Sequence, residues 1–410
     1  MNIQIKTTIQ FLFYISILSI FIINSNVYPI IFGFFVISTN ILLLYNGGYA
    51  VKKWTLLILS FLFWGILIYI IQNEYSSEDL KMLSKMIVNL LFFFTVINSG
   101  EKIIDDKFWK RTLLVFEVII VLSFVQYMYL YYKLDLFSLI VHTADSMTAY
   151  KITENPQLLF WGNYSKNILA TKIILAQICY FYIVINKFKF TKKNMLLLIL
   201  SVCNAILCLS RTAQLTYFGA LGIYILFTVI KSKKTYIKVF AMLPMVLGFC
   251  LLFVKIDDLL RINFDITDGG YIRLIYWNTF LDNFLETSYF IGNGLLSTAN
   301  FLSRYSYYYI GENNMHNVFL NMLLDFGFVG TSLYVLMLIS YYRSYRRISA
   351  KLYNRLILIF SWFAVTSLQY VGYDNDLIVF LIIIYLVHIN PLIIGRELTD
   401  ESFNYRAKLF

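Results

Sequence analysis

Residues 54–72 read WTLLILSFLFWGILIYIIQ, a continuous apolar run without a charged side chain. An α-helix rises 1.5 Å per residue, so about 20 such residues cross the roughly 30 Å hydrocarbon core of a bilayer. A strand of a membrane β-barrel would instead show about ten residues of alternating polarity. The run therefore predicts a membrane-spanning helix.

Comparable runs recur along the whole chain and predict an all-α, polytopic integral membrane protein with about twelve transmembrane helices. We treat residues 1–410 as a single membrane domain. The predicted spans are 9–25, 27–45, 54–72, 82–98, 112–132, 167–186, 194–210, 212–230, 236–255, 316–340, 356–372 and 376–394.

The composition agrees with this fold class. Hydrophobic residues make up 60% of the chain and charged residues only 14%, whereas a soluble domain carries about 25% charged residues. This excludes a soluble globular enzyme, a disordered chain and a fibrous protein. The four cysteines lie in apolar runs without paired spacing, so they indicate neither a zinc site nor a disulfide framework.

The net charge of +11 follows from topology. Short cytoplasmic loops of membrane proteins are enriched in Lys and Arg, and no cleavage site follows the first apolar run, which we expect to be retained. With both termini in the cytoplasm, every inner segment is basic and the acidic residues concentrate outside. No nucleic-acid partner is needed to explain the charge. The inner clusters include Lys52 and Lys53; Lys102, Lys107, Lys110 and Arg111; Lys187, Lys189, Lys192 and Lys193; and Arg343, Arg346, Arg347 and Lys351.

Two outer segments, 133–166 and 256–315, are too long to be simple connections. The second is the large extracytoplasmic loop between the ninth and tenth predicted helices. Within it, residues 273–286 (RLIYWNTFLDNFLE) place apolar side chains at helical spacing. They predict an amphipathic helix that lies on the membrane surface or at the outer mouth of the protein.

The large loop ends in GENNMHNVFLNMLLDFGFVG, residues 311–330, where polar residues lead directly into a predicted span. This stretch resembles the superfamily of bacterial O-antigen polymerases and O-antigen ligases. The likeness covers about residues 160–335. It rests on His316 and Asn317 followed by Leu320, Asp325, Gly327 and Gly330, with support from Arg273, Trp277, Gly292-Asn293-Gly294, Ser210-Arg211-Thr212, Gly162-Asn163 and Asn167.

The resemblance implies transfer of a glycan from an undecaprenyl-diphosphate donor to an acceptor hydroxyl. Such a reaction needs cations to stabilise the departing diphosphate and a base to accept the hydroxyl proton. Arginine suits the first role because its guanidinium binds phosphate oxygens in a fork and stays charged, and histidine suits the second near neutral pH. We expect Arg211 and Arg273 to bind the diphosphate and His316 to be the base, oriented by Glu312, with Asn317, Asn314 and Trp277 in support.

Each of these residues also has a structural interpretation. Arg211 fits an interface anchor whose head group reaches water, and Arg273 fits a solvated loop residue. His316 fits a polar residue at a helix N-terminus, hydrogen-bonded to Asn313 or Asn314.

The sequence predicts neither a metal nor another cofactor. The first outer connection, 24–28, holds no acidic residue of the kind that metal-dependent polyprenyl-phosphate glycosyltransferases carry there. Asp374-Asn375-Asp376 is a lone DxD triplet, for which solvation is a sufficient explanation.

The resulting hypothesis is a metal-independent, inverting polymerase of lipid-linked oligosaccharide repeat units at the outer face of a bacterial plasma membrane. Its partners would be the undecaprenyl-diphosphate-linked oligosaccharide, membrane lipid, a flippase and a chain-length regulator. An O-antigen ligase that transfers the glycan to a lipid or protein acceptor is the first alternative. A lipid-linked oligosaccharide flippase or secondary transporter is another, although Pro29, Pro156, Pro244 and Pro391 form no matched pair of broken helices. A non-catalytic envelope assembly component is the last.

Overall fold

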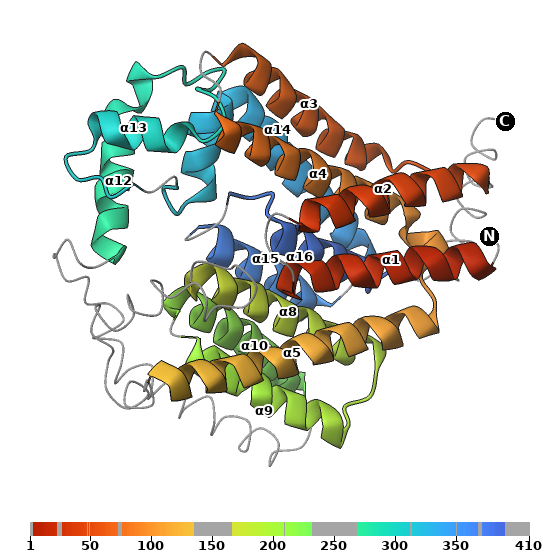
Figure 1. The fold of residues 1–410 in the computed structure, drawn as a ribbon. Coiled ribbons are helices and arrows are strands. Elements are labelled where there is room, and N and C mark those ends of the chain that lie inside the picture. The colour runs from red at the N-terminus through yellow and green to blue at the C-terminus, as the bar shows by residue number, and fades with distance from the viewer. Residues whose placement is uncertain are drawn as a thin grey trace.

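The computed structural model describes residues 3–22, 27–46, 48, 50–72, 76–134, 166–208, 210–231, 269–311, 314–349, 351–367 and 371–389. These residues form thirteen α-helices, two short 3-10 helices and no strand, which confirms the predicted all-α class for this part of the chain (Figure 1). The helices are α1 (Ile3–Ile22), α2 (Tyr28–Tyr45), η1 (Lys53–Thr55), α3 (Leu56–Ile71), α4 (Ser77–Ile103), α5 (Asp106–Leu134), α8 (Lys166–Lys187), α9 (Lys192–Leu207), α10 (Arg211–Lys231), α12 (Gly269–Asn283), η4 (Phe284–Glu286), α13 (Ser297–Tyr305), α14 (Val318–Ile348), α15 (Leu352–Thr366) and α16 (Asn375–Leu386).

Seven helical stretches of the described chain are long and apolar enough to cross a membrane, so the protein is a multi-pass membrane protein. They correspond to α1, α2, η1 with α3, α4, α5, α8 and α14. α15 and α16 are shorter apolar helices. The predicted span at 236–255 lies outside the described residues, and the total of twelve spans stays a prediction.

Several helices begin where the sequence supplies a cap. Ser76 and Asp79 form a reciprocal capping box at the start of α4, in which each side chain accepts the backbone N–H of the other. Thr191 and Asn194 repeat this arrangement at the start of α9. These bonds satisfy N–H groups that the first helical turn leaves without partners.

The helices pack as two groups, which meet through α16 and through a direct contact of α1 with α5. One group consists of α1, α2, α3, α4 and α14, and the other of α5, α8, α9, α10 and α15. α16 packs on α4 and α8, and all of its residues are buried. Twelve residues rise only about 18 Å, so α16 on its own is too short to cross the hydrocarbon core. It is apolar on every side because protein surrounds it on every side.

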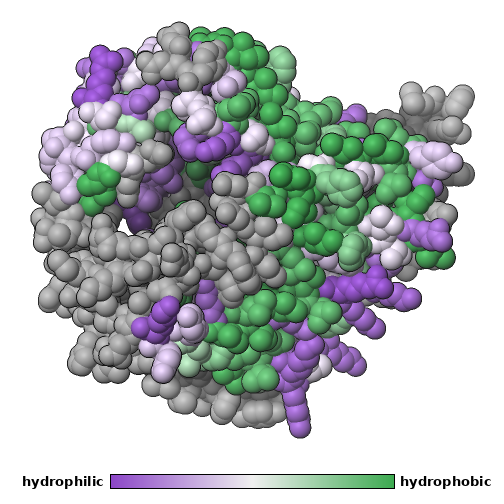
Figure 2. Space-filling model, viewed as in Figure 1, coloured by the Kyte–Doolittle hydropathy of each residue, from purple (hydrophilic) through white to green (hydrophobic). Residues whose placement is uncertain are grey.

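One end of the bundle carries α12 and α13, and we call it the capped end. In Figure 1 these turquoise helices lie at the left, and α12 runs across the direction of α1 and α5 instead of along it. Figure 2 shows hydrophobic side chains over the sides of the bundle and hydrophilic side chains gathered over α12 and α13. This distribution is the one expected of a bundle whose sides face lipid and whose ends face water.

α14 is broken at Gly327, whose backbone angles are φ 64° and ψ −169°. Essentially only glycine adopts this region. The break divides the helix into residues 318–326 and 328–348 (Figure 1). A Cβ at position 327 would lie 2.5 Å from backbone atoms of Phe290 and Ile291, so the 287–294 loop packs directly against the break.

The backbone groups freed at the break find new partners. The N–H of Asn293 donates to Leu324 O at 2.8 Å, and the N–H of Phe328 donates to Tyr289 O at 2.9 Å. From α3, Trp64 Nε1 donates to Phe326 O at 3.0 Å. An interrupted helix within a membrane is stable only when its freed backbone groups are bonded in this way.

Candidate functional site

His316 precedes α14 and has a left-handed backbone, with φ 53°. This conformation is uncommon for residues other than glycine and costs about 1–3 kcal/mol, so surrounding contacts must maintain it. The N–H of His316 donates to Asn314 Oδ1 at 2.7 Å. Asn317, the next residue, caps α14 by accepting the N–H groups of Phe319 and Leu320 at 3.0 and 3.3 Å.

Asn321, one turn into α14, bonds to residues 314 and 315, which precede His316. Its Oδ1 accepts the N–H of Met315 at 3.0 Å, and its Nδ2 donates to Asn314 Oδ1 at 2.6 Å. On α13, the Thr298 hydroxyl donates to the same Asn321 Oδ1 at 3.3 Å. Asn321 is 3% exposed and Thr298 is 1% exposed, so these bonds are shielded from water. The histidine backbone is therefore fixed by a buried network of amides.

α12 is attached to this network through Trp277, whose Nε1 donates to Met315 O at 2.8 Å. The apolar face of α12 packs with α13, Met315 and Leu324 in a cluster separate from the main core. Arg273 lies four residues before Trp277 and therefore on the same face of α12. The structure thus brings Arg273, Trp277, Asn314 and His316 into one region at the capped end.

Arg211 begins α10, which packs on α15 and α8. Near the middle of the pair, a Cβ at Gly219 would meet the ring of Phe360. Further along, the rings of Tyr224 and Tyr353 have centroids 6.0 Å apart. Higher residue numbers in α10 thus meet lower numbers in α15, so the two helices are antiparallel. Arg211 consequently lies at the level where α15 ends.

The end of α15 also meets the beginning of α14. The rings of Phe319 and Trp362 have centroids 6.0 Å apart, and Phe319 lies three residues after His316. Arg211 and His316 are therefore at the same end of the bundle. They belong to different packing units, however, because Arg211 is on α10 whereas His316 is held by α12, α13 and α14.

Two other predicted features can be placed only in part. Glu312 and Asn313 lie outside the described residues, so the proposed orientation of His316 by Glu312 stays a prediction. Asp376 is buried and Asp374 is half-buried, which corrects the interpretation of this triplet as a solvated one. Burial and the neighbouring Asp376 raise the pKa of Asp374, in the connection before α16, to about 6. The described residues contain no group of three or more His, Cys, Asp or Glu side chains positioned for a metal ion.

Reasoning from the sequence missed the residues that hold the helix break. Asp325 is 3% exposed and accepts both the N–H and the hydroxyl of Ser297, at 3.1 and 2.7 Å. A Cβ at Gly330 would meet Trp64. Asp325, Gly327 and Gly330 had contributed only to a family likeness. An acidic residue and two glycines inside an apolar run were the available signal for a break.

Together these features define a multi-pass membrane protein with a polar, helix-capped site at one end. The chain segment 196–335, from α9 into α14, matches the family model described as O-antigen ligase. This match confirms the resemblance and includes Arg211, Arg273, Trp277, Asn314, His316 and Asn317. This segment, about a third of the chain, is therefore similar to the O-antigen ligase domain, whose family members are membrane enzymes that transfer glycans. No curated protein matches the chain.

Proposed function

We propose that this protein polymerises lipid-linked oligosaccharide repeat units into a surface polysaccharide at the outer face of a bacterial plasma membrane. The observation that carries the proposal is the position of His316. Its backbone is held in a strained conformation by buried amides, at the same end of the bundle as two arginines. Strain maintained in this way is characteristic of functional sites.

The reaction joins an acceptor sugar hydroxyl to the anomeric carbon of the donor. The hydroxyl oxygen forms the new C–O bond while its proton passes to the imidazole of His316. The bond between the anomeric carbon and the diphosphate oxygen breaks, and undecaprenyl diphosphate leaves with the electron pair. The guanidinium groups of Arg211 and Arg273 stabilise the negative charge on this leaving group. Direct displacement inverts the anomeric configuration, and no step requires a metal.

The distribution of charge supports an outward-facing capped end. Most basic residues of the described chain lie at the opposite end, where Lys52 pairs with Glu101 and Lys6 with Asp105 at 3.0 and 2.9 Å. Positive charge favours the cytoplasmic side of a membrane. Both termini would then be cytoplasmic and the site would face outward. The basic residues at that end include Lys6, Lys52, Lys53, Lys102, Lys187, Lys192, Lys193, Arg343, Arg346 and Arg347.

Substitution of the three site residues tests the mechanism. We expect His316→Ala, Arg211→Ala and Arg273→Ala each to reduce chain growth by about a hundredfold or more, the usual effect of losing a general base or an oxyanion-type donor. Arg304→Ala is the matched control, because Arg304 is exposed on α13 at the same end and stacks on Tyr305. The readout is polymer length in cells, with membrane levels of each variant measured in parallel. Wild-type polymer in any of the three site variants would remove that residue from the mechanism.

A reconstituted assay separates polymerase from ligase. Purified protein in proteoliposomes receives only the lipid-linked repeat unit. A polymerase forms a ladder of products from this substrate alone, whereas a ligase needs an added lipid or protein acceptor.

The flippase and polymerase hypotheses predict that single lipid-linked repeat units accumulate on different faces of the membrane in cells that lack the protein. Loss of a flippase leaves single lipid-linked repeat units on the inner face of the membrane, and loss of a polymerase leaves them on the outer face. A chain-length regulator and a flippase are proposed partners of the polymerase.

A further inference from the structure

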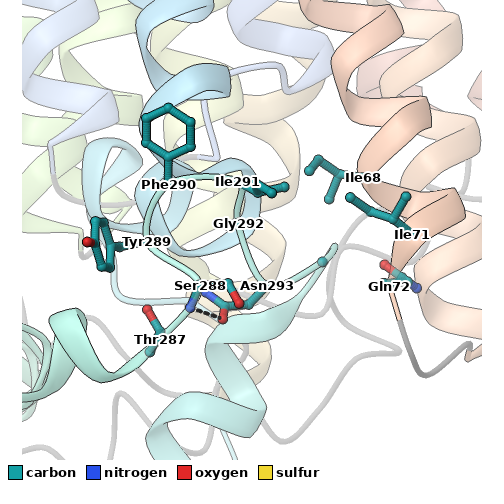
Figure 3. Close-up of a pocket in the computed structure, with 11 residues that line it drawn as sticks. Ile68, Ile71, Gln72, Thr287, Ser288, Tyr289, Phe290, Ile291, Gly292 and Asn293 are labelled. Carbon is teal, nitrogen blue, oxygen red and sulfur yellow. Dashed lines mark hydrogen bonds between the residues drawn. The ribbon is translucent and has the colours of Figure 1, made fainter.

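A cavity of about 560 Å³ lies between the end of α3 and the 287–294 loop, away from His316. Figure 3 shows Ile68, Ile71 and Gln72 of the α3 end on one side, and Thr287 to Asn293 on the other. Its volume falls within the range of small-molecule binding sites. The mechanism proposed above makes no use of this cavity.

The loop that forms the cavity is rigidly built. Asn293 Oδ1 accepts the N–H of Ser288 at 3.0 Å, while Asn293 Nδ2 donates to Leu324 O at 2.9 Å. Gln72 Oε1 accepts the N–H of Leu295 at 3.1 Å, which ties the loop to α3. A Cβ at Gly292, where φ is 113°, would lie 2.4 Å from Asp325 O. The cavity is therefore preformed and does not need a ligand to shape it.

The lining identifies the chemical class of the ligand. It combines the amides of Gln72 and Asn293 and the hydroxyls of Thr287 and Ser288 with isoleucine and aromatic residues, without a charged group. The nearby carboxylate of Asp79, 3.4 Å from Gln72 Nε2, disfavours a phosphate or another anion. Amides and hydroxyls beside apolar groups suit a neutral sugar, whose hydroxyls need hydrogen bonds and whose C–H face needs apolar contact.

The distance between the cavity and His316 indicates how far from the reacting bond a sugar in the cavity would lie. The 287–294 loop bonds to α14 at residues 324–329, whereas His316 precedes residue 318. The intervening helical segment 318–326 is about 14 Å long at 1.5 Å per residue. That length requires several linked sugars and not one.

We propose that this cavity is a subsite for an uncharged sugar residue of the glycan, several sugars away from the bond being formed. This inference rests on the proposed glycan transfer. Its function is to retain the growing chain between successive additions. A polymerase that holds its product in this way adds many units before release.

Two neighbouring residues of α3 provide the test. Ile71 lines the cavity, whereas Ile70 does not and is 64% exposed. Purified full-length variants in proteoliposomes receive native lipid-linked repeat units. We expect Ile71→Trp to fill the cavity, raise the KM for oligosaccharide acceptors about tenfold and shorten the product ladder. The first transfer onto a single-unit acceptor and the donor KM should stay at the wild-type level. Ile70→Trp should give the wild-type ladder.

Identical ladders from Ile71→Trp and Ile70→Trp, whether long or short, would overturn the subsite. A crosslinking measurement gives an answer even if Ile71→Trp folds poorly. Ser288 is replaced by p-benzoylphenylalanine, with Ser303 on α13 as the control position. The probe is the repeat-unit oligosaccharide released by mild acid from the lipid-linked pool of the source cells and radiolabelled at its reducing end. An adduct at position 288 and not at 303 is expected, and an adduct with phospholipid alone would overturn the proposal.

These outcomes separate the two hypotheses. If the wild-type protein forms no ladder, the proposed function is wrong, and the crosslinking result still decides whether the cavity binds sugar. If the wild-type protein forms a ladder that Ile71→Trp leaves unchanged, only the subsite is wrong.

Discussion

At the scale of single residues, Asn321 is the main support of the candidate base. It bonds to the backbone N–H of Met315 and to the side chain of Asn314, which in turn accepts the N–H of His316. Met315 is fully buried, and a buried N–H without a partner costs about 1–3 kcal/mol. Asn321→Ala should therefore release the left-handed backbone of His316 and lower kcat for chain growth by about tenfold or more.

The donor KM should change little in this variant, because Asn321 does not line the proposed diphosphate site. Asn278→Ala on the exposed face of α12 is the control and should behave as wild type. An Asn321→Ala protein that reaches the membrane and retains wild-type kcat would show that the amide network does not position His316.

The sequence allowed the polar cluster to be located but not its internal roles. The supporting roles of Asn314 and Asn317 in the chemistry stay a prediction; in the structure both accept backbone N–H groups, Asn314 from His316 and Asn317 from the first turn of α14. The positive φ of His316 is held by its bond to Asn314, which Asn321 of α14 fixes in turn. Asn314 is a local signal for a turn at this position, but it does not specify a left-handed histidine.

At the scale of elements, α14 shows what hydropathy cannot reveal. An apolar run over 316–340 predicted one span, and hydropathy does not show the break because hydrophobicity is the same on both sides of a kink. The break at Gly327 depends on partners from α3 and from the 287–294 loop, hundreds and tens of residues away. By contrast, the capping box of α4 is local and was readable in the order Ser76 to Asp79.

Gly327→Ala tests the importance of the break. The new Cβ would meet three backbone atoms at 2.5–2.6 Å, and the backbone would have to hold an alanine at φ 64°. We expect this variant to lower the melting temperature in detergent strongly, with strain of about 1–3 kcal/mol in addition to the steric clash. Gly222→Ala on α10 is the matched control, because its Cβ would enter open space within a helix, where alanine is favoured. Equal melting temperatures for the two variants would contradict a requirement for glycine at the break.

At the scale of the whole molecule, the hydrophobic runs predicted the class of fold because lipid imposes a strong and local requirement on each span. They predicted a span at 376–394, but not that its helix, α16, is short and buried against α4 and α8. A buried helix and a lipid-facing helix are equally apolar, so composition cannot distinguish them. Composition also could not show that Arg211 lies at the level of His316, because this position follows from the antiparallel packing of α10 and α15.

The orientation of the whole bundle decides whether the proposed chemistry is possible, since lipid-linked repeat units are joined at the outer face. Ser303 on α13 and Lys189 between α8 and α9 are both exposed and mark the two ends. Cys179 and Cys208 are buried whereas Cys203 is half-buried, so Cys203 and Cys250 are first replaced by serine to lower the background with a membrane-impermeant maleimide. On right-side-out spheroplasts we expect Ser303→Cys to react at once, and Lys189→Cys to react only after permeabilisation. This pattern follows from the basic residues, which the membrane retains on the cytoplasmic side. The reverse pattern would leave the geometry around His316 intact but place it in the cytoplasm, where it could not extend a polysaccharide on the cell surface.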